Sequence, residues 1–180
     1  KSGLILQYLY IVENENELGQ KDNLSMNTNH SDPYSLNHVQ MHKTYKHILD
    51  NYGLYDILLL NASGDVIYSV EKEKDLGTNV LNGVYSNSGL AKVFKELQGK
   101  QSGTIAFSDY APYEPSYNDQ GLFLASPLNF SKDFEGVVVF QLPRTKINNV
   151  MNFHGNFEKA VLDKTGIANL VSQEGYMKND

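Results

Sequence analysis

Apolar residues recur along the chain with two different periods, and the change of period separates helical from extended segments. At the start they follow helical spacing, forming a broad apolar face that includes Leu4 and Tyr8 and continues to Leu18. A polar stretch rich in Asn, Asp and Ser follows. A second helix is predicted over residues 36–51, ended by Gly53. The pattern therefore predicts two helices before the first strand.

From residue 54 onward the pattern favours strands. The runs LYDILLL (54–60) and VIYSV (66–70), separated by the turn NASGD, predict a β-hairpin. After a loop rich in Gly and Asn, Ser88 is expected to cap a helix over GLAKVFKELQ, which Gly99 closes. This segment is the most regular helical pattern in the second half of the chain.

Three more strands are predicted after that helix, namely GTIAFSDY, GLFLASPL and EGVVVFQLP. A short helix, RTKINNVMNF, and one further strand in the tail 165–180 complete the chain. The short links between strands imply antiparallel pairing, so the predicted fold class is α+β rather than doubly wound α/β. We divide the 180 residues into an N-terminal helix with its polar loop (1–35) and one domain (36–180).

The amino-acid composition and net charge argue against several classes of function. The net charge is −6 and the only arginine is Arg144, so a nucleic-acid partner is not expected. Because there is no cysteine, disulfides, thiolate zinc sites and thiol nucleophiles are excluded. No apolar run approaches the roughly 20 residues of a membrane span, and no signal-peptide pattern opens the chain. We expect the sequence to be a segment of a longer protein.

An enzyme is not predicted either. The chain has no glycine-rich phosphate loop, no G-x-S-x-G motif and no H-E-x-x-H motif. His38 and His42 stand four residues apart on one predicted helix, a spacing that suits a zinc ion, but a catalytic site needs a third ligand and a general base. Two histidines at the surface or boundary of the helix are the favoured interpretation over a metallohydrolase. No cofactor is predicted.

The stretch from residue 107 to residue 128, FSDYAPYEPSYNDQGLFLASPL, concentrates rigid and hydrogen-bonding side chains. Pro112 and Pro115 stiffen its backbone, so that side chains between them lose little entropy on binding a ligand. Tyr110 and Tyr113 offer flat apolar surface together with a hydroxyl group. The segment is either the wall of a small-ligand pocket or a packed tyrosine-rich loop that covers one end of the sheet.

Several motifs in order resemble one family. They are HKTYKHILDNYGLYDILLLNASGDVIYSVEKEKDLGTNV, NSGLAKVFKEL, SDYAPYEPS, LFLASPL, GVVVFQLP, INNVM and the tail DKTGIANLVSQEGYMKND. From about residue 38 to residue 180 the chain resembles the extracytoplasmic Cache (PAS-like) sensor domains of bacterial receptors, especially methyl-accepting chemotaxis proteins. The resemblance implies a long N-terminal helix that emerges from an inner-membrane span, followed by a curved antiparallel sheet with flanking helices.

In that family the ligand lies between the sheet and the loops and helix that cover it. Carried over by position, the implied pocket residues are Asp109, Tyr110, Tyr113 and Ser116 as the wall, Phe123 and Ala125 as the floor, and Tyr55 with Ile57 beside them. Phe123 is a core residue with or without a ligand. Asp109 either orients a donor in the pocket or caps a backbone turn.

The chain departs from the family at a charged position. Where the family has an arginine in the helix before the hairpin, this sequence has Lys46, and the neighbouring proline is replaced by Lys43 or Thr44. Lysine is a point charge that holds a carboxylate less directionally than arginine. Lys46 is expected either to neutralise a ligand carboxylate or to be a solvated helix residue.

These features together predict a periplasmic ligand-sensing domain of a bacterial inner-membrane chemoreceptor, which is not an enzyme. The expected ligand is a small polar metabolite, in particular a short organic acid. The apolar face of the N-terminal helix needs a partner, either the sheet of this domain or a second copy of the helix, and a homodimer through this helix is expected. The alternative is a ligand-free structural or dimerisation module of a histidine kinase or a cyclic-dinucleotide signalling receptor.

Overall fold

The computed structural model describes residues 2–27, 32–129 and 133–151, with Leu170, Val171, Gly175 and Met177. The helices are α1 (Ser2–Gln7), a π-helical turn (Tyr8–Val12), a 3-10 turn (Lys21–Asn23), α2 (Pro33–Tyr52), α3 (Gly89–Leu97), a second 3-10 turn (Glu114–Ser116) and α4 (Arg144–Met151). The strands are β1 (Asp56–Asn61), β2 (Val66–Ser69), β3 (Ala106–Phe107), β4 (Ala111–Tyr113), β5 (Asp119–Leu128) and β6 (Gly136–Pro143).

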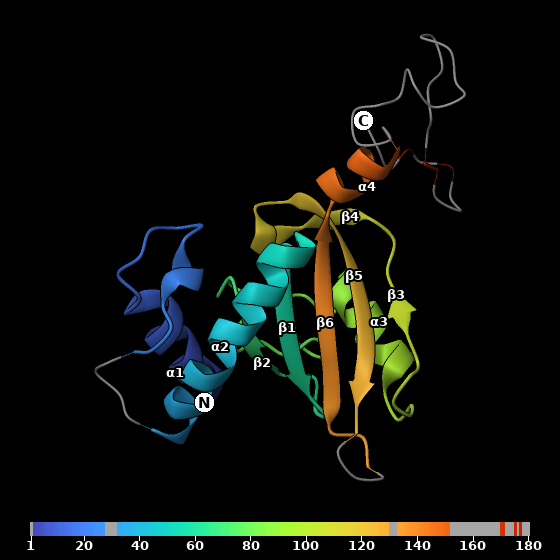
Figure 1. The fold of residues 1–180 in the computed structure, drawn as a ribbon. Helices are drawn as coiled ribbons and strands as arrows, with labels where there is room; N and C mark the ends of the chain where they lie inside the picture. The colour runs from blue at the N-terminus through green and yellow to red at the C-terminus, as the bar shows by residue number, and fades with distance from the viewer. Residues whose placement is uncertain are drawn as a thin grey trace.

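All the strands belong to one sheet in the order β2-β1-β6-β5-β3, and β4 pairs with the start of β5 (Figure 1). Every pairing is antiparallel. Strand β1 of the first hairpin lies between β2 and β6, although β6 comes much later in the sequence. The predicted α+β class with an antiparallel sheet is confirmed.

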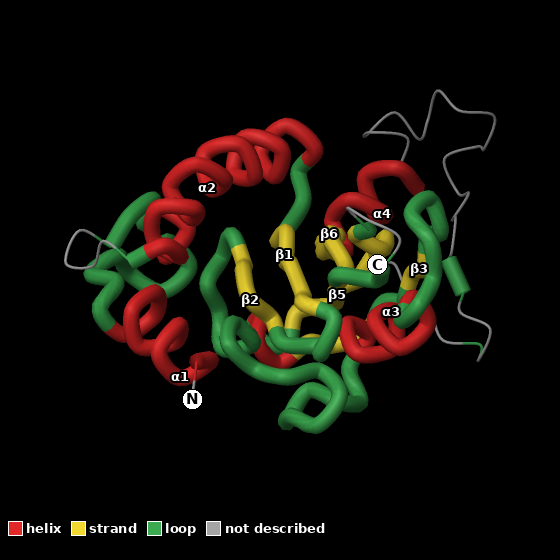
Figure 2. The backbone as a smooth tube through the Cα atoms, turned by 90° about the horizontal axis from the view of Figure 1, so that it is seen from below, coloured by secondary structure: helices red, strands yellow, loops and turns green. Residues whose placement is uncertain are grey.

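Figure 2 shows α2 on one side of the sheet and α3 on the other. A hydrophobic core lies between the sheet and each of these helices. On one face α3 contributes Leu90, Phe94 and Leu97, which pack against side chains of β1, β5 and β6. On the other face α2 contributes Leu49, packed against Ile57 and other residues of β1 and β2. Strand alternation explains the division, because successive side chains of a strand point to opposite faces.

Helix α2 is the long helix that precedes the sheet. Asp32 caps its start, since its carboxylate accepts hydrogen bonds from the backbone N–H groups of Tyr34 (2.9 Å) and Ser35 (3.1 Å). Pro33 occupies the first helical turn, where its missing N–H costs nothing. Gly53 ends the helix with a left-handed φ of 56°. The helix begins three residues before the predicted start, because the Asp-Pro capping signal precedes the first apolar position.

Other boundaries differ from the predicted ones. The first helix ends at Val12, so Leu18 lies beyond it. The strand predicted over 103–110 is paired only at Ala106–Phe107, and β4 forms inside the bend, where no strand was predicted. The predicted tail strand lies almost entirely outside the described residues. The described part of this tail contains an antiparallel bridge between Val171 and Met177. In the described residues, no helix is both long enough and apolar enough to span a bilayer.

Candidate ligand-binding site

The tyrosine- and proline-rich bend folds inward onto two acidic side chains. Tyr113 is buried at the end of β4 and donates a hydrogen bond from its hydroxyl to Asp75 Oδ2 at 2.8 Å. Ser116 is also buried, in the 3-10 turn that contains Pro115, and donates to Glu73 Oε2 at 2.9 Å. Tyr117 and its neighbour Asn118 then take left-handed φ angles of 56° and 62° and lead the chain into β5. The hydroxyls of Tyr113 and Ser116 thus face the interior.

Glu73 is the centre of this arrangement. Its second oxygen accepts a hydrogen bond from the Tyr55 hydroxyl at 2.7 Å, and Ser116 in turn accepts one from Gln141 Nε2 at 2.9 Å. Gln141 has room at this position because Gly121 on β5 has no side chain: a Cβ there would lie 2.9 Å from Gln141 Nε2. We call Tyr55, Glu73, Asp75, Tyr113, Ser116 and Gln141 the Glu73 cluster.

Burial shifts the acid–base behaviour of the cluster. It raises the pKa of Glu73 to about 7, and the hydroxyl donors of Tyr55 and Ser116 only partly offset this effect. Burial also raises the pKa of Asp75 to about 6, against the lowering effect of the Tyr113 hydrogen bond. In both carboxyls, desolvation therefore outweighs hydrogen bonding, and near neutral pH a proton is easily gained or lost.

A cavity of about 320 Å³ adjoins the Glu73 cluster at the end of the sheet. Its lining comes from the segment before β1, the start of β5, the end of β6 and the first turns of α4. The lining residues are Tyr55, Asn118, Asp119, Gln120, Gln141, Pro143, Arg144, Thr145 and Asn148. Tyr55 and Gln141 belong to both the cavity and the Glu73 cluster, so one layer of side chains separates Glu73 from the hollow.

Three of the residues predicted for the pocket, Tyr113, Phe123 and Ala125, belong to the core on the α3 face. Tyr113 packs edge-on against Phe123, with ring centroids 4.9 Å apart, and Ala125 belongs to the same core. Tyr110 is buried, and its hydroxyl donates to the carbonyl of Pro143 at 3.3 Å. Ile57 points to the opposite face, into the core under α2. Of the predicted residues, Tyr55 is the one that lines the cavity.

Lys46 and Asp109 lie apart from the Glu73 cluster. Lys46 is on α2 and forms an ion pair with Asp22, on the opposite side of the sheet from Tyr113. Asp109 is exposed, and its carboxylate accepts a hydrogen bond from the N–H of the next residue, Tyr110, at 2.9 Å.

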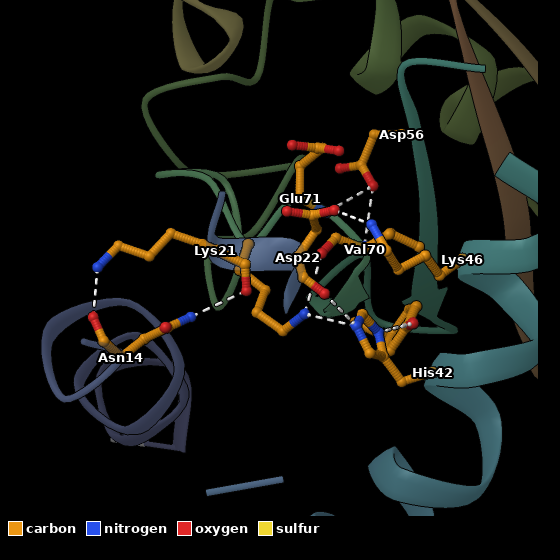
Figure 3. A network of polar contacts seen from close by, with 10 residues as sticks. Asn14, Lys21, Asp22, His42, Lys46, Asp56, Val70 and Glu71 are labelled. Carbon is orange, nitrogen blue, oxygen red and sulfur yellow. Dashed lines mark hydrogen bonds and ion pairs between the residues drawn. The ribbon is translucent and has the colours of Figure 1, made fainter. Parts of the chain in front are cut away.

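A second polar cluster lies between α2, the N-terminal segment and the end of β2 (Figure 3). It contains Asp22, His42, Lys46, Asp56, Glu71 and Lys72, and we call it the Lys72 cluster. Lys72 is 1% exposed and has a left-handed φ of 57°. Its Nζ donates to the carbonyl of Val70 at 2.9 Å and lies 3.3 Å from His42 Nε2. Burial, which disfavours its charged form, lowers the pKa of Lys72 to about 7.

Asp56 holds the turn that follows β2. Its carboxylate accepts hydrogen bonds from the N–H groups of Val70 (2.9 Å) and Glu71 (3.1 Å) and from the Ser69 hydroxyl (2.7 Å). Burial raises the pKa of Asp56 well above its ordinary value. These bonds join the start of β1 to the turn after β2 and fix the backbone from which Lys72 and Glu73 project to different sides.

His38 and His42 are buried, which corrects the prediction of surface or boundary residues. Their rings stack at 4.7 Å, and each donates to a backbone carbonyl of the N-terminal segment: His38 Nδ1 to Ser25 at 2.7 Å and His42 Nε2 to Asp22 at 2.6 Å. Burial lowers the pKa of His38 to about 3 and that of His42 to about 4. Within the described residues, no three potential ligands are grouped to hold a metal ion.

Glu73, Asp75 and Gln141 were missed by sequence reasoning. The run Glu71 to Asp75 alternates acid and lysine, and no candidate residue was taken from it. In the structure Glu71 and Lys72 belong to the Lys72 cluster, and Glu73 and Asp75 to the Glu73 cluster. Gln141 does follow Val137 and Val139 at strand spacing in β6, so the period of the strand could have placed it on the buried face.

A second hollow, of about 420 Å³, lies between α1 and β2. Its acidic group, Asp65, is already bonded to the side chains of Asn61 (3.0 Å) and Asn79 (2.8 Å). Leu4 and Leu6 supply apolar lining. Because its charged group is satisfied within the protein, this hollow is a weaker candidate for a polar ligand than the cavity beside Glu73.

Proteins similar to this chain were found by comparing structures. No family model matches the chain, and no curated protein matches it. The ligand-binding domain of the Pseudomonas fluorescens chemoreceptor CtaA, solved with L-serine, matches with a TM-score of 0.53 and 14% identity, over 99% of this chain and 69% of that one. The ligand-binding domain of the Pseudomonas aeruginosa amino acid chemoreceptor PctB, solved with L-Gln, matches with a TM-score of 0.50 and 18% identity, over 99% and 65%.

The sensor domain of the V. cholerae histidine kinase DctB is also matched, with a TM-score of 0.46 and 15% identity, over 82% of this chain and 53% of that one. The chain thus spans between about half and two thirds of the length of these solved domains. The α+β arrangement around an antiparallel sheet is the PAS-like Cache fold that the chemoreceptor domains share.

Proposed function

We propose that the chain is a periplasmic ligand-sensing domain of a bacterial inner-membrane receptor, and that the receptor is a chemoreceptor. The observation that carries the proposal is the cavity of about 320 Å³ beside a buried polar cluster. Concave sites of a few hundred Å³ with a small number of placed polar groups are typical of small-molecule sites. The fold it shares with chemoreceptor ligand-binding domains supports the same conclusion.

The proposed ligand is a small polar metabolite that bears a carboxylate, as a short organic acid does. Arg144, the only arginine in the sequence, lines the cavity at the first turn of α4. A guanidinium group presents a planar fork that matches a carboxylate. Arg144 therefore takes the role that the sequence suggested for Lys46, which lies across the sheet. Binding beside α4 would shift the packing of that helix on β6, and this shift is the proposed start of the signal.

A ligand panel tests this proposal by thermal shift. Organic acids and amino acids are added at increasing concentration, and a ligand at about 100 times its Kd stabilises the protein by about 2.7 kcal/mol. Asn148→Phe should fill the cavity from α4 and remove the shift. Asn149→Phe, on the exposed side of the same helix, should leave it unchanged. If no compound raises the melting temperature, the ligand-free structural module becomes the better interpretation.

We further propose that residues 1–35 join the domain to the membrane and contribute a homodimer contact. Leu4, Ile5, Tyr8 and Val12 are 72%, 57%, 53% and 69% exposed, although all four are large apolar side chains on one short helical segment. Exposed apolar surface of this kind marks an interaction site. Sedimentation analysis of the wild type and of Leu4→Ser/Tyr8→Ser should show a dimer that the double substitution weakens. A wild type that is monomeric at every concentration contradicts the dimer.

A further inference from the structure

We propose that residues 13–27, which we call the strap, are held on α2 by His38 and His42 near neutral pH and are released when these two histidines take up protons. The release requires no ligand, so it goes beyond the proposed ligand-sensing function and does not depend on it. The strap begins where the first helical segment ends, at Val12, so its release would change how that segment is joined to the sheet.

The strap is a polar segment with little apolar anchoring. Its sequence, ENENELGQKDNLSMN, contains three large apolar side chains, Leu18, Leu24 and Met26. Leu18 is 77% exposed, and Leu24 packs against the hydrophobic cluster around Tyr10. Polar contacts therefore supply much of what holds the strap in place.

Two stacked histidines of α2 provide such contacts. The ring of His38 donates to the carbonyl of Ser25, and the ring of His42 donates to the carbonyl of Asp22. Lys46, one turn further along the helix, adds the ion pair with the Asp22 carboxylate. Each imidazole bond fixes which nitrogen of the neutral ring carries the proton, Nδ1 in His38 and Nε2 in His42. The other nitrogen of each ring is the one that would take up a second proton.

In His38 that nitrogen is Nε2, which is enclosed by aromatic rings. The side chain is 1% exposed, and Nε2 has no hydrogen-bond partner in the described structure. The rings in contact with it belong to Tyr10, Tyr34, His42 and Tyr68. A proton on Nε2 would therefore create a buried N–H group without an acceptor, on a charged ring.

In His42 that nitrogen is Nδ1, which accepts a hydrogen bond from the Tyr68 hydroxyl at 2.8 Å. The Nζ of Lys72 lies 3.3 Å from Nε2 of the same ring. Burial lowers the pKa of Lys72 to about 7, so this amine is charged below pH 7. A proton on Nδ1 would deprive the Tyr68 hydroxyl of its acceptor and place a second positive charge beside Lys72.

The acids around the two histidines do not balance this charge. Asp22 is already paired with Lys46, and Asp32, on the Tyr10 side, is bonded to the first turn of α2. Burial raises the pKa of Asp56 well above its ordinary value and that of Glu71 to about 7. These last two acids therefore lose their charge as the pH falls, when the histidines would need it.

The direction of the pH response follows from burial. It lowers the pKa of His38 to about 3 and that of His42 to about 4, from an ordinary value of 6.5, so between these values the released form binds more protons than the docked form. Each histidine holds the strap fully above pH 6.5, and its contribution is lost as the pH falls toward the lowered pKa. In this window each histidine shifts the equilibrium toward release by up to about tenfold per pH unit.

Hydrogen exchange followed by mass spectrometry on the wild-type domain, between pH 7.5 and pH 5, tests the release. Peptides from the strap are compared with peptides from α3 in the same sample, so that the pH dependence of the chemical exchange step cancels. The protection of the strap relative to α3 should fall by at least about tenfold as the pH is lowered. Circular dichroism should show that the domain stays folded over the same range.

Variants assign the response to the two histidines. His38→Asn and His42→Gln, made together, keep an N–H donor near the position of each imidazole donor and cannot take up a proton. In this double variant the strap should stay protected at pH 5. The matched control His47→Gln removes an exposed histidine of the same helix and should keep the wild-type pH dependence.

If the double variant does not fold, nuclear magnetic resonance of the wild-type imidazoles provides the second measurement. Proton uptake by His38 and His42 and the loss of strap protection should then share one midpoint. A wild-type strap that stays protected at pH 5, a double variant with the wild-type pH dependence, or a loss of protection that coincides with global unfolding overturns the proposal. None of these results bears on the ligand panel, which measures binding at the cavity lined by Arg144.

Discussion

The two polar clusters on either side of the segment 71–75 both contain carboxylates. They differ in the groups that surround these carboxylates and donate hydrogen bonds to them. In the Lys72 cluster the acids lie near lysines, and Asp56 is saturated by backbone and hydroxyl donors. In the Glu73 cluster the side-chain donors to the two acids are hydroxyls, and Oδ1 of Asp75 has no hydrogen-bond partner. Both clusters are partly to fully buried, and burial raises carboxyl pKa values in both. The difference lies in how completely the protein satisfies them.

This contrast separates an architectural role from a functional one. A carboxylate whose donors are all supplied by the chain holds the fold together and gains nothing from a ligand. A buried carboxylate with spare acceptor capacity keeps a shifted pKa, and such groups gather at functional sites. The Lys72 cluster joins the N-terminal segment and α2 to the sheet, whereas the Glu73 cluster borders the hollow under α4.

The largest expected effect is on stability and concerns Asp56. Asp56→Ala leaves the N–H groups of Val70 and Glu71 and the Ser69 hydroxyl without their acceptor, and should lower the free energy of unfolding by about 3–5 kcal/mol. Asp75→Ala, the matched change in the other cluster, removes a single hydroxyl bond and should cost about 1–2 kcal/mol.

Denaturation in urea measures both values with the same two-state fit. Equal losses for the two alanine variants would contradict the distinction between a saturated and an unsaturated cluster. A larger loss for Asp75→Ala would reverse it, and would make Asp75 an architectural residue.

The second effect concerns pH. The folded-state pKa of Glu73 is about 7, above its ordinary value of 4.5, so the folded protein binds more protons than the unfolded chain between these values. The stability that this group contributes is complete below pH 4.5 and is lost as the pH rises through 7. Because Glu73→Gln does not titrate, its free energy of unfolding relative to the wild type should rise by roughly 2 kcal/mol over this window.

Thermal or urea unfolding at several pH values between 4.5 and 7.5 measures this difference in the free energy of unfolding. The titration of His38 and His42, whose pKa values are lowered, is the same in both proteins and cancels in the difference. The control Glu114→Gln should stay nearly flat over this range, because the Lys74 and Tyr85 hydrogen bonds lower the pKa of Glu114 and its titration then falls below pH 4.5. A flat difference for Glu73→Gln would mean that Glu73 is solvated in the folded protein.

The sequence predicted the helices and strands better than it predicted the residues of the candidate site. Period 2 and period 3.6 identified β1, β2, β5, β6, α3 and α4, because each buries one continuous face. It did not identify β4, a three-residue strand that exists only because the bend folds back on β5. Tyr113 and Ser116 were chosen for their chemistry, and the structure gives them buried acidic partners. Those partners, Glu73 and Asp75, lie about 40 residues earlier in a charged run, where no local pattern reveals which acid faces inward.

The smallest expected effect concerns Lys46, whose predicted role depended on resemblance alone. Lys46 belongs to the satisfied cluster, with 32% of its side chain exposed and Asp22 as its partner. Lys46→Met should therefore cost only about 0.5–1 kcal/mol in the free energy of unfolding, as expected for a half-exposed ion pair. The affinity for any ligand found with the panel should stay within about twofold of wild type, because Lys46 is not among the residues that line the cavity. Calorimetry on this variant decides between the two regions: a large loss of affinity would place the ligand on the α2 face and remove the reason for assigning it to the cavity lined by Arg144.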